Sequence, residues 1–316
     1  MKAAWDSGTP HNRGQMTAII KHNLGVYFMV LACLEFAFIG LCAKVLSQEG
    51  LPSIEIMFFR NGVGTIFMLY LLSKVKIHKE GGHFFLLIFR GLVGTISLYL
   101  FFYNISHISL GGAFAFQKIS PIFITLIAFF VFKENIGIKG WLGIIIAFAG
   151  VLCISQPFGA QISQMDTKNA ILGVISGFFA ALALVSVRQL RHFYPTEYIA
   201  FSFIAIGTIL PLCSMIVGAF YAPENLDFFI APFVMPSMKA WVFIAIMGAL
   251  GTLYQIHVTK SYGVAKKAGI VAGVSYLDVV FSLLIGSFFD GLPSFLMLLG
   301  IGAIVFGGLI LVYRKS

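Results

Sequence analysis

The sequence predicts an all-α membrane protein with ten transmembrane helices, arranged as two inverted repeats of five helices. Three observations support this fold class. Hydrophobic residues make up 59% of the 316-residue chain and charged residues only 10%, whereas a soluble protein has about a quarter charged residues. Ten apolar segments are each long enough to cross a bilayer, which takes about 20 residues. The last five segments also resemble the first five.

The ten segments follow one another with mostly short connections. We expect helices over residues 24–46, 53–73, 84–104, 110–132, 138–155, 170–190, 196–221, 239–261, 267–289 and 293–313. Residues 1–22 are polar and basic, so we expect a disordered cytoplasmic N-terminus. The first repeat then covers 24–155 and the second 170–313, with residues 156–169 as an external linker between them.

Local signals support individual helices. The segment 24–46 is too long for a signal peptide, so we expect a retained first helix. Segments two and seven each carry an acid in the first turn, Glu55 and Glu197, where a negative charge is favourable. Pro121 removes a backbone donor in segment four and predicts a bend there. Segments five and ten carry glycines at seven-residue spacing, which indicate close helix packing: Gly143 and Gly150, and Gly300 and Gly307.

The distribution of Lys and Arg predicts the orientation. With the N-terminus in the cytoplasm, 15 of the 21 basic residues fall on cytoplasmic segments and three near the outside: Lys44, Lys168 and Lys239. Cytoplasmic loops carry an excess of Lys and Arg. We therefore expect a multi-pass protein of the cytoplasmic (inner) membrane with both termini in the cytoplasm. Because the basic residues lie in short connections, we expect no nucleic-acid partner.

An internal repeat runs through both halves at an offset of 156 or 157 residues. It relates Gly94-Thr95 to Gly251-Thr252, and Glu134 to Asp290. A repeat with an odd number of crossings places its two copies in opposite orientations, which is common among secondary transporters.

These segments resemble the drug/metabolite transporter superfamily, specifically proteins with two EamA repeats, over about residues 24–313. The matching stretches are EIMFFR at 55–60, RGL at 90–92 and FKE at 132–134. SYLD at 275–278 resembles a segment of S-adenosylmethionine carriers. The resemblance implies a ten-helix carrier whose central cavity is lined by helices one to four and six to nine, with helices five and ten at the periphery.

Four ionisable residues fall near the middle of predicted helices. The acids are Glu35 and Asp278, and the bases are Arg60 and Lys118. A charge at the bilayer centre costs about 2.5–3.5 kcal/mol on insertion scales. Two interpretations remain open: structural ion pairs, or a cavity in which the acids bind a proton or cationic group and the bases an anionic group.

Other polar residues in the same helices are candidates for the cavity wall. Gln117 and Tyr276 lie beside Lys118 and Asp278 in segments that the repeat relates. Further wall candidates are Tyr99, Tyr103, Tyr254, Gln255 and His257, each with a structural role as the alternative. We expect Lys44 to extend to the membrane interface, and for Arg90 this interfacial role is one of two alternatives.

The sequence therefore predicts a secondary active transporter for a small polar or amphipathic metabolite, such as an amino acid derivative or S-adenosylmethionine. It would work by alternating access, coupled to protons or to exchange. The first alternative is an exporter of lipophilic cationic drugs, and the second is a channel. The sequence has no P-loop and no H-E-x-x-H motif, so we expect no enzyme activity, no cofactor and no metal site. The expected partners are the cargo, the lipid bilayer and protons, and the sequence leaves a homodimer open.

Overall fold

The computed structural model describes residues 10–74, 81–108, 110–131, 133, 135, 137–155, 167–223, 226–265, 271, 273–290 and 295–313. Within this part of the chain the regular elements are all helices. They are α1 (Pro10–Gln48), α2 (Ser53–Leu72), α3 (Phe84–His107), α4 (Leu110–Gln117), α5 (Ser120–Phe130), α6 (Gly137–Ser155), α7 (Thr167–Leu190), α8 (Thr196–Gly218), α9 (Met238–Val264), α11 (Leu277–Asp290) and α12 (Phe295–Tyr313).

The described helices match the predicted membrane segments in order. Seven are long and apolar enough to cross a membrane, with α4 and α5 counted together as Leu110–Phe130. Three shorter apolar stretches lie in α6, α11 and α12. The prediction of an all-α protein that crosses the membrane several times is confirmed.

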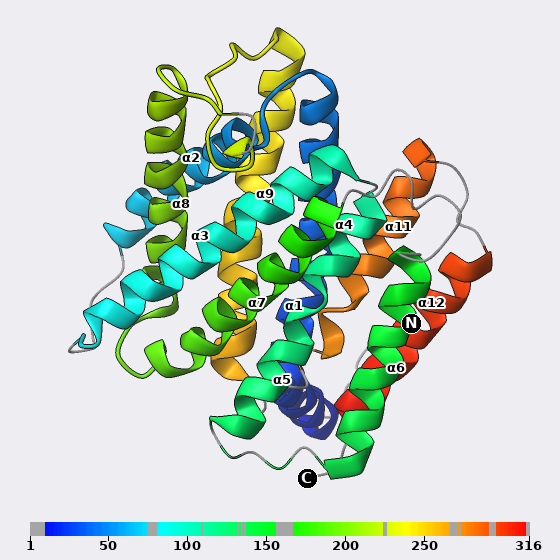
Figure 1. Ribbon diagram of the computed structural model, residues 1–316. Coiled ribbons are helices and arrows are strands. Elements are labelled where there is room, and N and C mark those ends of the chain that lie inside the picture. Colours follow the sequence, from blue (N-terminus) through cyan, green and yellow to red (C-terminus); the bar gives the residue numbers. More distant parts are fainter. Residues whose placement is uncertain are drawn as a thin grey trace, which may run out of the picture.

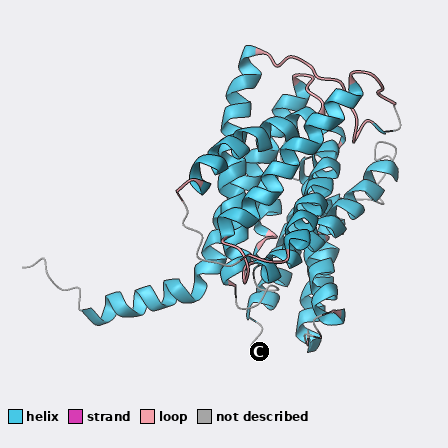
Figure 2. Ribbon diagram, turned by 90° about the vertical axis from the view of Figure 1, so that its left-hand side faces the viewer, coloured by secondary structure: helices cyan, strands magenta, loops and turns pink. Residues whose placement is uncertain are grey.

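Helix α1 begins at Pro10, so residues 10–22 are helical. The sequence predicts disorder there, and that prediction is wrong for residues 10–22. The apolar stretch from Leu24 is already helical, and extending a helix avoids the cost of nucleating one. Proline is also well tolerated in a first helical turn. Figure 2 shows this end of α1 projecting from the bundle, whereas residues 1–9 lie outside the described part.

Helix packing couples the two halves of the chain. Helix α1 packs on α9 and α3 packs on α7, while α2 packs on α8. Helix α2 also contacts α9, and α8 likewise contacts α3. The predicted repeat relates α1 to α7, α2 to α8 and α3 to α9. When each helix is exchanged for its related helix, the α1–α9 contact becomes α7–α3 and the α2–α9 contact becomes α8–α3, so the set of pairs stays the same. Most described core contacts therefore join the halves.

Helices α6 and α12 form a separate pair at one side of the bundle (Figure 1). Glycines allow their backbones to approach, since a Cβ added at Gly307 would lie 2.6 Å from the carbonyl oxygen of Gly143. This contact is the close packing that small residues permit in membrane helices. The peripheral position leaves the central space to the other helices.

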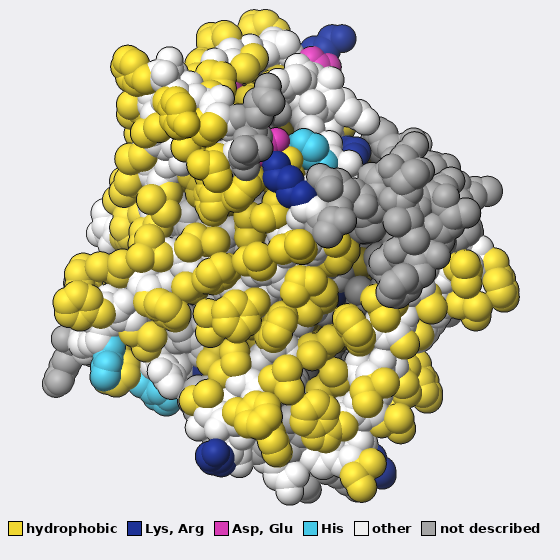
Figure 3. Space-filling view, viewed as in Figure 1, with side chains coloured by type: hydrophobic (Ala, Val, Ile, Leu, Met, Phe, Trp, Pro, Cys, Tyr) yellow, Lys and Arg dark blue, Asp and Glu magenta, His cyan; other side chains and the backbone are white. Residues whose placement is uncertain are grey.

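The flank of the bundle is apolar. Figure 3 shows hydrophobic side chains over most of the face, and most of the visible Lys and Arg lie above or below this band. Large side chains such as Ile66, Phe85 and Phe306 are more than half exposed. Apolar exposure on this scale is what contact with lipid requires.

Candidate functional site

Two small cavities adjoin in the middle of the bundle, with volumes of about 30 Å³ and 60 Å³. Both are lined by one set of residues from α1, α4, α7 and α9, namely Phe36, Gln117, Ala180, Leu184, Tyr254 and Val258. One water needs at least about 10–15 Å³ of such space. The cavities therefore have room for a few waters each and are too small for a metabolite.

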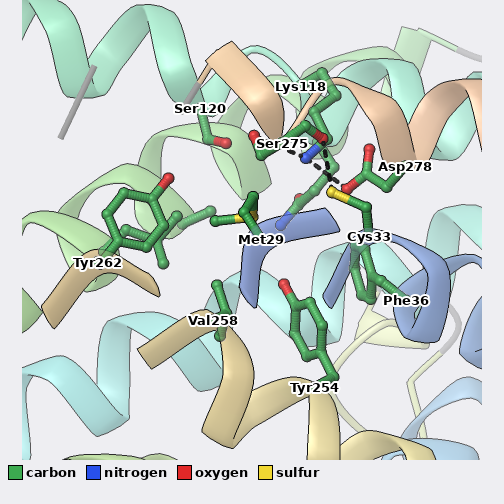
Figure 4. Close-up of a pocket in the computed structure, with 13 residues that line it drawn as sticks. Met29, Cys33, Phe36, Lys118, Ser120, Tyr254, Val258, Tyr262, Ser275 and Asp278 are labelled. Carbon is green, nitrogen blue, oxygen red and sulfur yellow. Dashed lines mark hydrogen bonds and ion pairs between the residues drawn. The ribbon is translucent and has the colours of Figure 1, made fainter. Parts of the chain in front are cut away.

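The smaller cavity contains a buried ion pair, so we call it the ion-pair cavity. Lys118 Nζ lies 2.5 Å from Asp278 Oδ2, and both side chains are less than a tenth exposed. Lys118 Nζ also lies 3.3 Å from the hydroxyl oxygen of Ser275, to which it donates a hydrogen bond. The second oxygen of Asp278 has no hydrogen-bond partner. Figure 4 shows Lys118 and Asp278 turned toward each other, with Tyr254 facing them.

Broken helices bring these two residues together. Lys118 and Ile119 separate α4 from α5, where Pro121 in the first turn of α5 has no backbone N–H to donate. Asp278 lies in the first turn of α11, directly after a turn at Ser275 and Tyr276. These are the two segments that the predicted repeat relates, and the interruptions lie at corresponding positions, 118–119 and 275–276. Irregular backbone at this depth is tolerated where it lines a cavity.

The larger cavity is lined by Arg90 from α3, and we call it the arginine cavity. Arg90 is 2% exposed, and its Nε and Nη1 atoms have no hydrogen-bond partner. Its guanidinium carbon lies 4.7 Å from the ring centre of Phe203. The alternative that Arg90 extends to the membrane interface is therefore wrong, because the side chain turns inward against α8.

Arg60 is a second buried arginine close to this cavity. It is 1% exposed, and its Nη1 donates to the Asn61 side-chain oxygen at 2.8 Å. Its Nε and Nη2 atoms have no partner, and its guanidinium carbon lies 5.9 Å from the ring centre of Tyr254. Among the described residues, no carboxylate forms an ion pair with Arg60 or Arg90.

Glu35 lies apart from both cavities. Its two carboxylate oxygens are 2.9 and 3.0 Å from Nδ1 of His257, across the contact between α1 and α9. The His257 ring stacks on Phe28, with ring centres 5.6 Å apart. Glu35 is therefore paired with a residue that the sequence indicated only as a wall candidate.

The two glutamines do line the cavities. Gln117 accepts a hydrogen bond from Ser176 at 2.8 Å and donates one to Ser97 at 3.4 Å. Gln255 lines the arginine cavity and donates to Thr259 at 3.1 Å. The amide of Gln117 is thus oriented by hydroxyls of α3 and α7, and that of Gln255 by a hydroxyl one turn later on its own helix, α9.

Three of the four tyrosines selected from the sequence, Tyr99, Tyr103 and Tyr276, lie outside both cavity linings, whereas the fourth, Tyr254, lines both. Tyr99 hydrogen-bonds Ser214 at 2.8 Å, and Tyr103 donates to Asp227 at 2.8 Å. Tyr276 is 1% exposed and its hydroxyl has no partner. The tyrosines that do face the ion-pair cavity are Tyr254 and Tyr262.

Sequence reasoning did not select Tyr262 or Cys33. The helical period could have identified both, because Tyr262 lies two turns after Tyr254 on α9, and Cys33 follows Met29 by one turn on α1. Cys33 directs its thiol toward the backbone carbonyls of Val274 and Ser275 at 3.8 and 3.7 Å. It therefore packs against the interrupted helix that carries Asp278.

Comparison with known proteins decides the family. Residues 23–156 match the EamA-like transporter family. An uncharacterized transporter of Helicobacter pylori is 30% identical over 294 residues, covering 91% of this chain and 94% of that protein. The chain belongs to the EamA-like transporter family. It is thus a transporter of the drug/metabolite transporter superfamily and not an enzyme.

Other members of the family are named for small-molecule transport. The pseudopaline exporter CntI of Pseudomonas aeruginosa is 30% identical over 261 residues, covering 82% of this chain and 84% of that protein. The riboflavin transporter of Vibrio cholerae is 23% identical, covering 78% of this chain and 79% of that protein. A solved crystal structure at 15% identity has a TM-score of 0.67 and covers 92% of this chain and 96% of that one, which shows the fold alone.

Proposed function

We propose that this EamA-family protein is a secondary active carrier that moves a small polar or amphipathic metabolite across the cytoplasmic membrane by alternating access. Protons or exchange would supply the drive. The cargo candidates are an amino acid or its derivative, including S-adenosylmethionine. The observation that carries the proposal is the Lys118–Asp278 pair, which joins the two halves of the chain beside a closed cavity.

Two inverted five-helix repeats, 24–155 and 170–313, would give this carrier its two states. The contacts between helices stay the same when the related helices of the two halves are exchanged, and this symmetry supports that arrangement. The matching interruptions before α5 and α11 support it as well. With both termini in the cytoplasm and 156–169 outside, each half would rock against the other around the ion pair.

The ion pair would couple movement to cargo or protons. Removing one partner from a buried pair costs about 3–5 kcal/mol, because the other charge stays buried alone. Separating Lys118 from Asp278 is therefore unfavourable until something takes the place of the lysine. A proton on Asp278, or a cationic group of the cargo, meets that requirement.

The alternatives fit the site less well. An exporter of lipophilic cations would bring positive charge to cavities that already have Arg60, Arg90 and Lys118 close by, against the single acid Asp278. A channel would need a continuous polar path, whereas the central space is divided into small volumes. The relatives named as a pseudopaline exporter and a riboflavin transporter also favour a polar metabolite over a drug cation.

Counterflow in proteoliposomes tests the proposal. The probe is the metabolite that most raises the thermal stability of the purified protein, taken from a panel of amino acids, S-adenosylmethionine and riboflavin. A carrier loaded inside with unlabelled probe accumulates labelled probe transiently against its gradient. Uptake that never exceeds equilibrium, with flux that does not saturate, would show a channel instead.

A further inference from the structure

Two buried arginines near Tyr254 are not explained by the ion pair: the guanidinium carbon of Arg60 lies 5.9 Å from the Tyr254 ring centre, and Arg90 lines the arginine cavity together with Tyr254. We propose that Arg60 and Arg90 form an anion subsite, which binds a carboxylate or phosphate group of the cargo in the arginine cavity, next to the ion-pair cavity that contains Asp278. The proposal rests on the proposed carrier function, since it assigns one part of the same space to one chemical group of the cargo.

The first reason is the number of free donors. Nε and Nη2 of Arg60, and Nε and Nη1 of Arg90, are buried without a hydrogen-bond partner. A buried donor without a partner is unfavourable, and a buried unpaired charge is more so. Guanidinium N–H groups match the two oxygens of a carboxylate or phosphate in pairs. An anionic group would accept hydrogen bonds from these donors; a carboxylate would offset one of the two charges, and a phosphate dianion both.

The second reason is the balance of charge in the described residues. Lys118 and Asp278 neutralise each other, and Glu35 is paired with His257 away from the cavities. Arg60 and Arg90 therefore leave the site with an excess positive charge. An anionic group of the cargo at these arginines would offset part or all of that excess.

The third reason is the way glycines make room for the arginines. A Cβ added at Gly251 on α9 would lie 2.9 Å from Cγ of Arg60 and 3.0 Å from its Nε. A Cβ added at Gly94 on α3 would lie 3.2 Å from Nη1 of Arg90. Gly94 and Gly251 are the repeat-related Gly-Thr positions. Each of these two related glycines thus leaves space beside one of the arginines, both of which lie in the first half of the chain.

Tyr254 links the two arginines to the central space. It lines both cavities, and its ring lies under the guanidinium of Arg60. Gln255, the next residue on α9, lines the same cavity as Arg90. One face of α9 therefore connects the anion subsite with the ion pair.

Thermal unfolding of the purified full-length protein tests the proposal. The probes are succinate, L-methionine and inorganic phosphate, with succinamide and L-methioninamide as matched compounds in which an amide replaces the carboxylate. We expect at least one anion to raise the melting temperature while its amide does not. In Arg60→Met and Arg90→Met, the apparent Kd for that anion should weaken about tenfold to hundredfold. Phosphate protection without carboxylate protection would assign the site to a phosphate.

Two further variants serve as controls. Arg90→Lys keeps the charge but loses the paired donors, so its anion affinity should fall between wild type and Arg90→Met. Lys44→Met removes a cation whose Nζ donates to the carbonyls of Ile105 and Ile108, away from the cavities. It should lower the melting temperature and leave anion protection unchanged.

The proposal is overturned if no anion protects the wild-type protein, or if both Arg→Met variants keep full protection. Counterflow separates this outcome from a failure of the carrier function. Counterflow without anion protection would reject the subsite and keep the carrier. Anion protection without counterflow of any probe would reject the carrier and keep the binding site.

Discussion

Lys118 and Asp278 lie where little water reaches them, so each charge depends on the other for its stability. Their side chains are 7% and 4% exposed, and one carboxylate oxygen is still free. A buried pair of this kind adds little net stability compared with apolar residues, yet removing one member is costly. The pair is therefore better suited to a switch than to holding the fold together.

A double-mutant cycle tests this dependence. Lys118→Met and Asp278→Leu should each destabilise the protein by about 3–5 kcal/mol, because each leaves a buried charge alone. The double variant leaves neither charge, so its destabilisation should be smaller than the sum of the two single effects by about 0.5–3 kcal/mol. The free energies of unfolding in detergent give this coupling directly. Simple additivity would mean that the two residues do not interact.

The two intramembrane acids should differ in their effect on transport. Asp278→Asn should abolish proton- or exchange-coupled uptake, because Asp278 lines the ion-pair cavity. Glu35→Gln should retain cargo binding, because Glu35 is held by His257 outside both cavity linings. Uptake and thermal protection measured on both variants check this difference. Loss of binding in Glu35→Gln alone would reverse the assignment.

Residue chemistry was more predictable than residue contacts. The sequence identifies Lys118, Asp278 and Arg60 because each charge inside an apolar helix needs a reason. It does not show that Glu35 pairs with His257, or that Arg90 turns inward, because the rotation of each helix is set by its neighbours. Tyr99 and Tyr103 lie outside the cavity linings for the same reason.

At the level of elements, the segment before α9 closes one end of the bundle against α3 and α7. Lys168 Nζ lies 2.7 Å from Asp227 Oδ1, and Tyr103 donates to the other oxygen. The ring of Phe229 packs on Tyr99. The segment 226–237 is thus held by one ion pair, by aromatic contacts and by a hydrogen bond that the Val234 N–H donates to Glu55 at 2.9 Å. It must release if this end of the bundle opens.

Asp227 gives this closure a defined pH dependence. Burial alone would raise the pKa of Asp227, but hydrogen bonds from Lys168 and Tyr103 lower the pKa below its usual value of 3.8. A carboxylate with a lowered pKa stabilises the folded state above its usual pKa and loses that effect as the pH falls through the lowered value. The closure should therefore persist at neutral pH and weaken only in strong acid.

Lys168→Met should loosen the segment without unfolding the protein. The Lys168–Asp227 pair is about a third exposed, and exposed pairs contribute at most about 1 kcal/mol. We expect faster hydrogen exchange of residues 226–237 by mass spectrometry, with a nearly unchanged melting temperature. Lys239→Met, at an exposed position at the start of α9, is the matched control. Equal exchange in the two variants would show that the ion pair does not hold the segment.

The approximate ends of most helices could be predicted from the lengths of the apolar segments. Bilayer thickness requires long apolar helices, so their order and approximate ends could be predicted. Pro121 indicated the interruption between α4 and α5, whereas the equivalent interruption before α11 has no proline to mark it. The helical extension to Pro10 was missed because its polar residues give no apolar signal.

For the whole molecule, we propose that one half of the chain is the other half turned over across the membrane, with Lys118 and Asp278 between them. The symmetry of the helix contacts and the offset repeat both support this proposal. It requires the linker 156–169 to lie on the opposite side from both termini.

Labelling of single cysteines in intact cells measures this most directly. Ser163→Cys and Ser316→Cys would each be placed in a chain without its four native cysteines and treated with a membrane-impermeant maleimide. We expect position 163 to be labelled at once and position 316 only after the cells are permeabilised. Labelling of both positions from the same side would contradict the inverted arrangement.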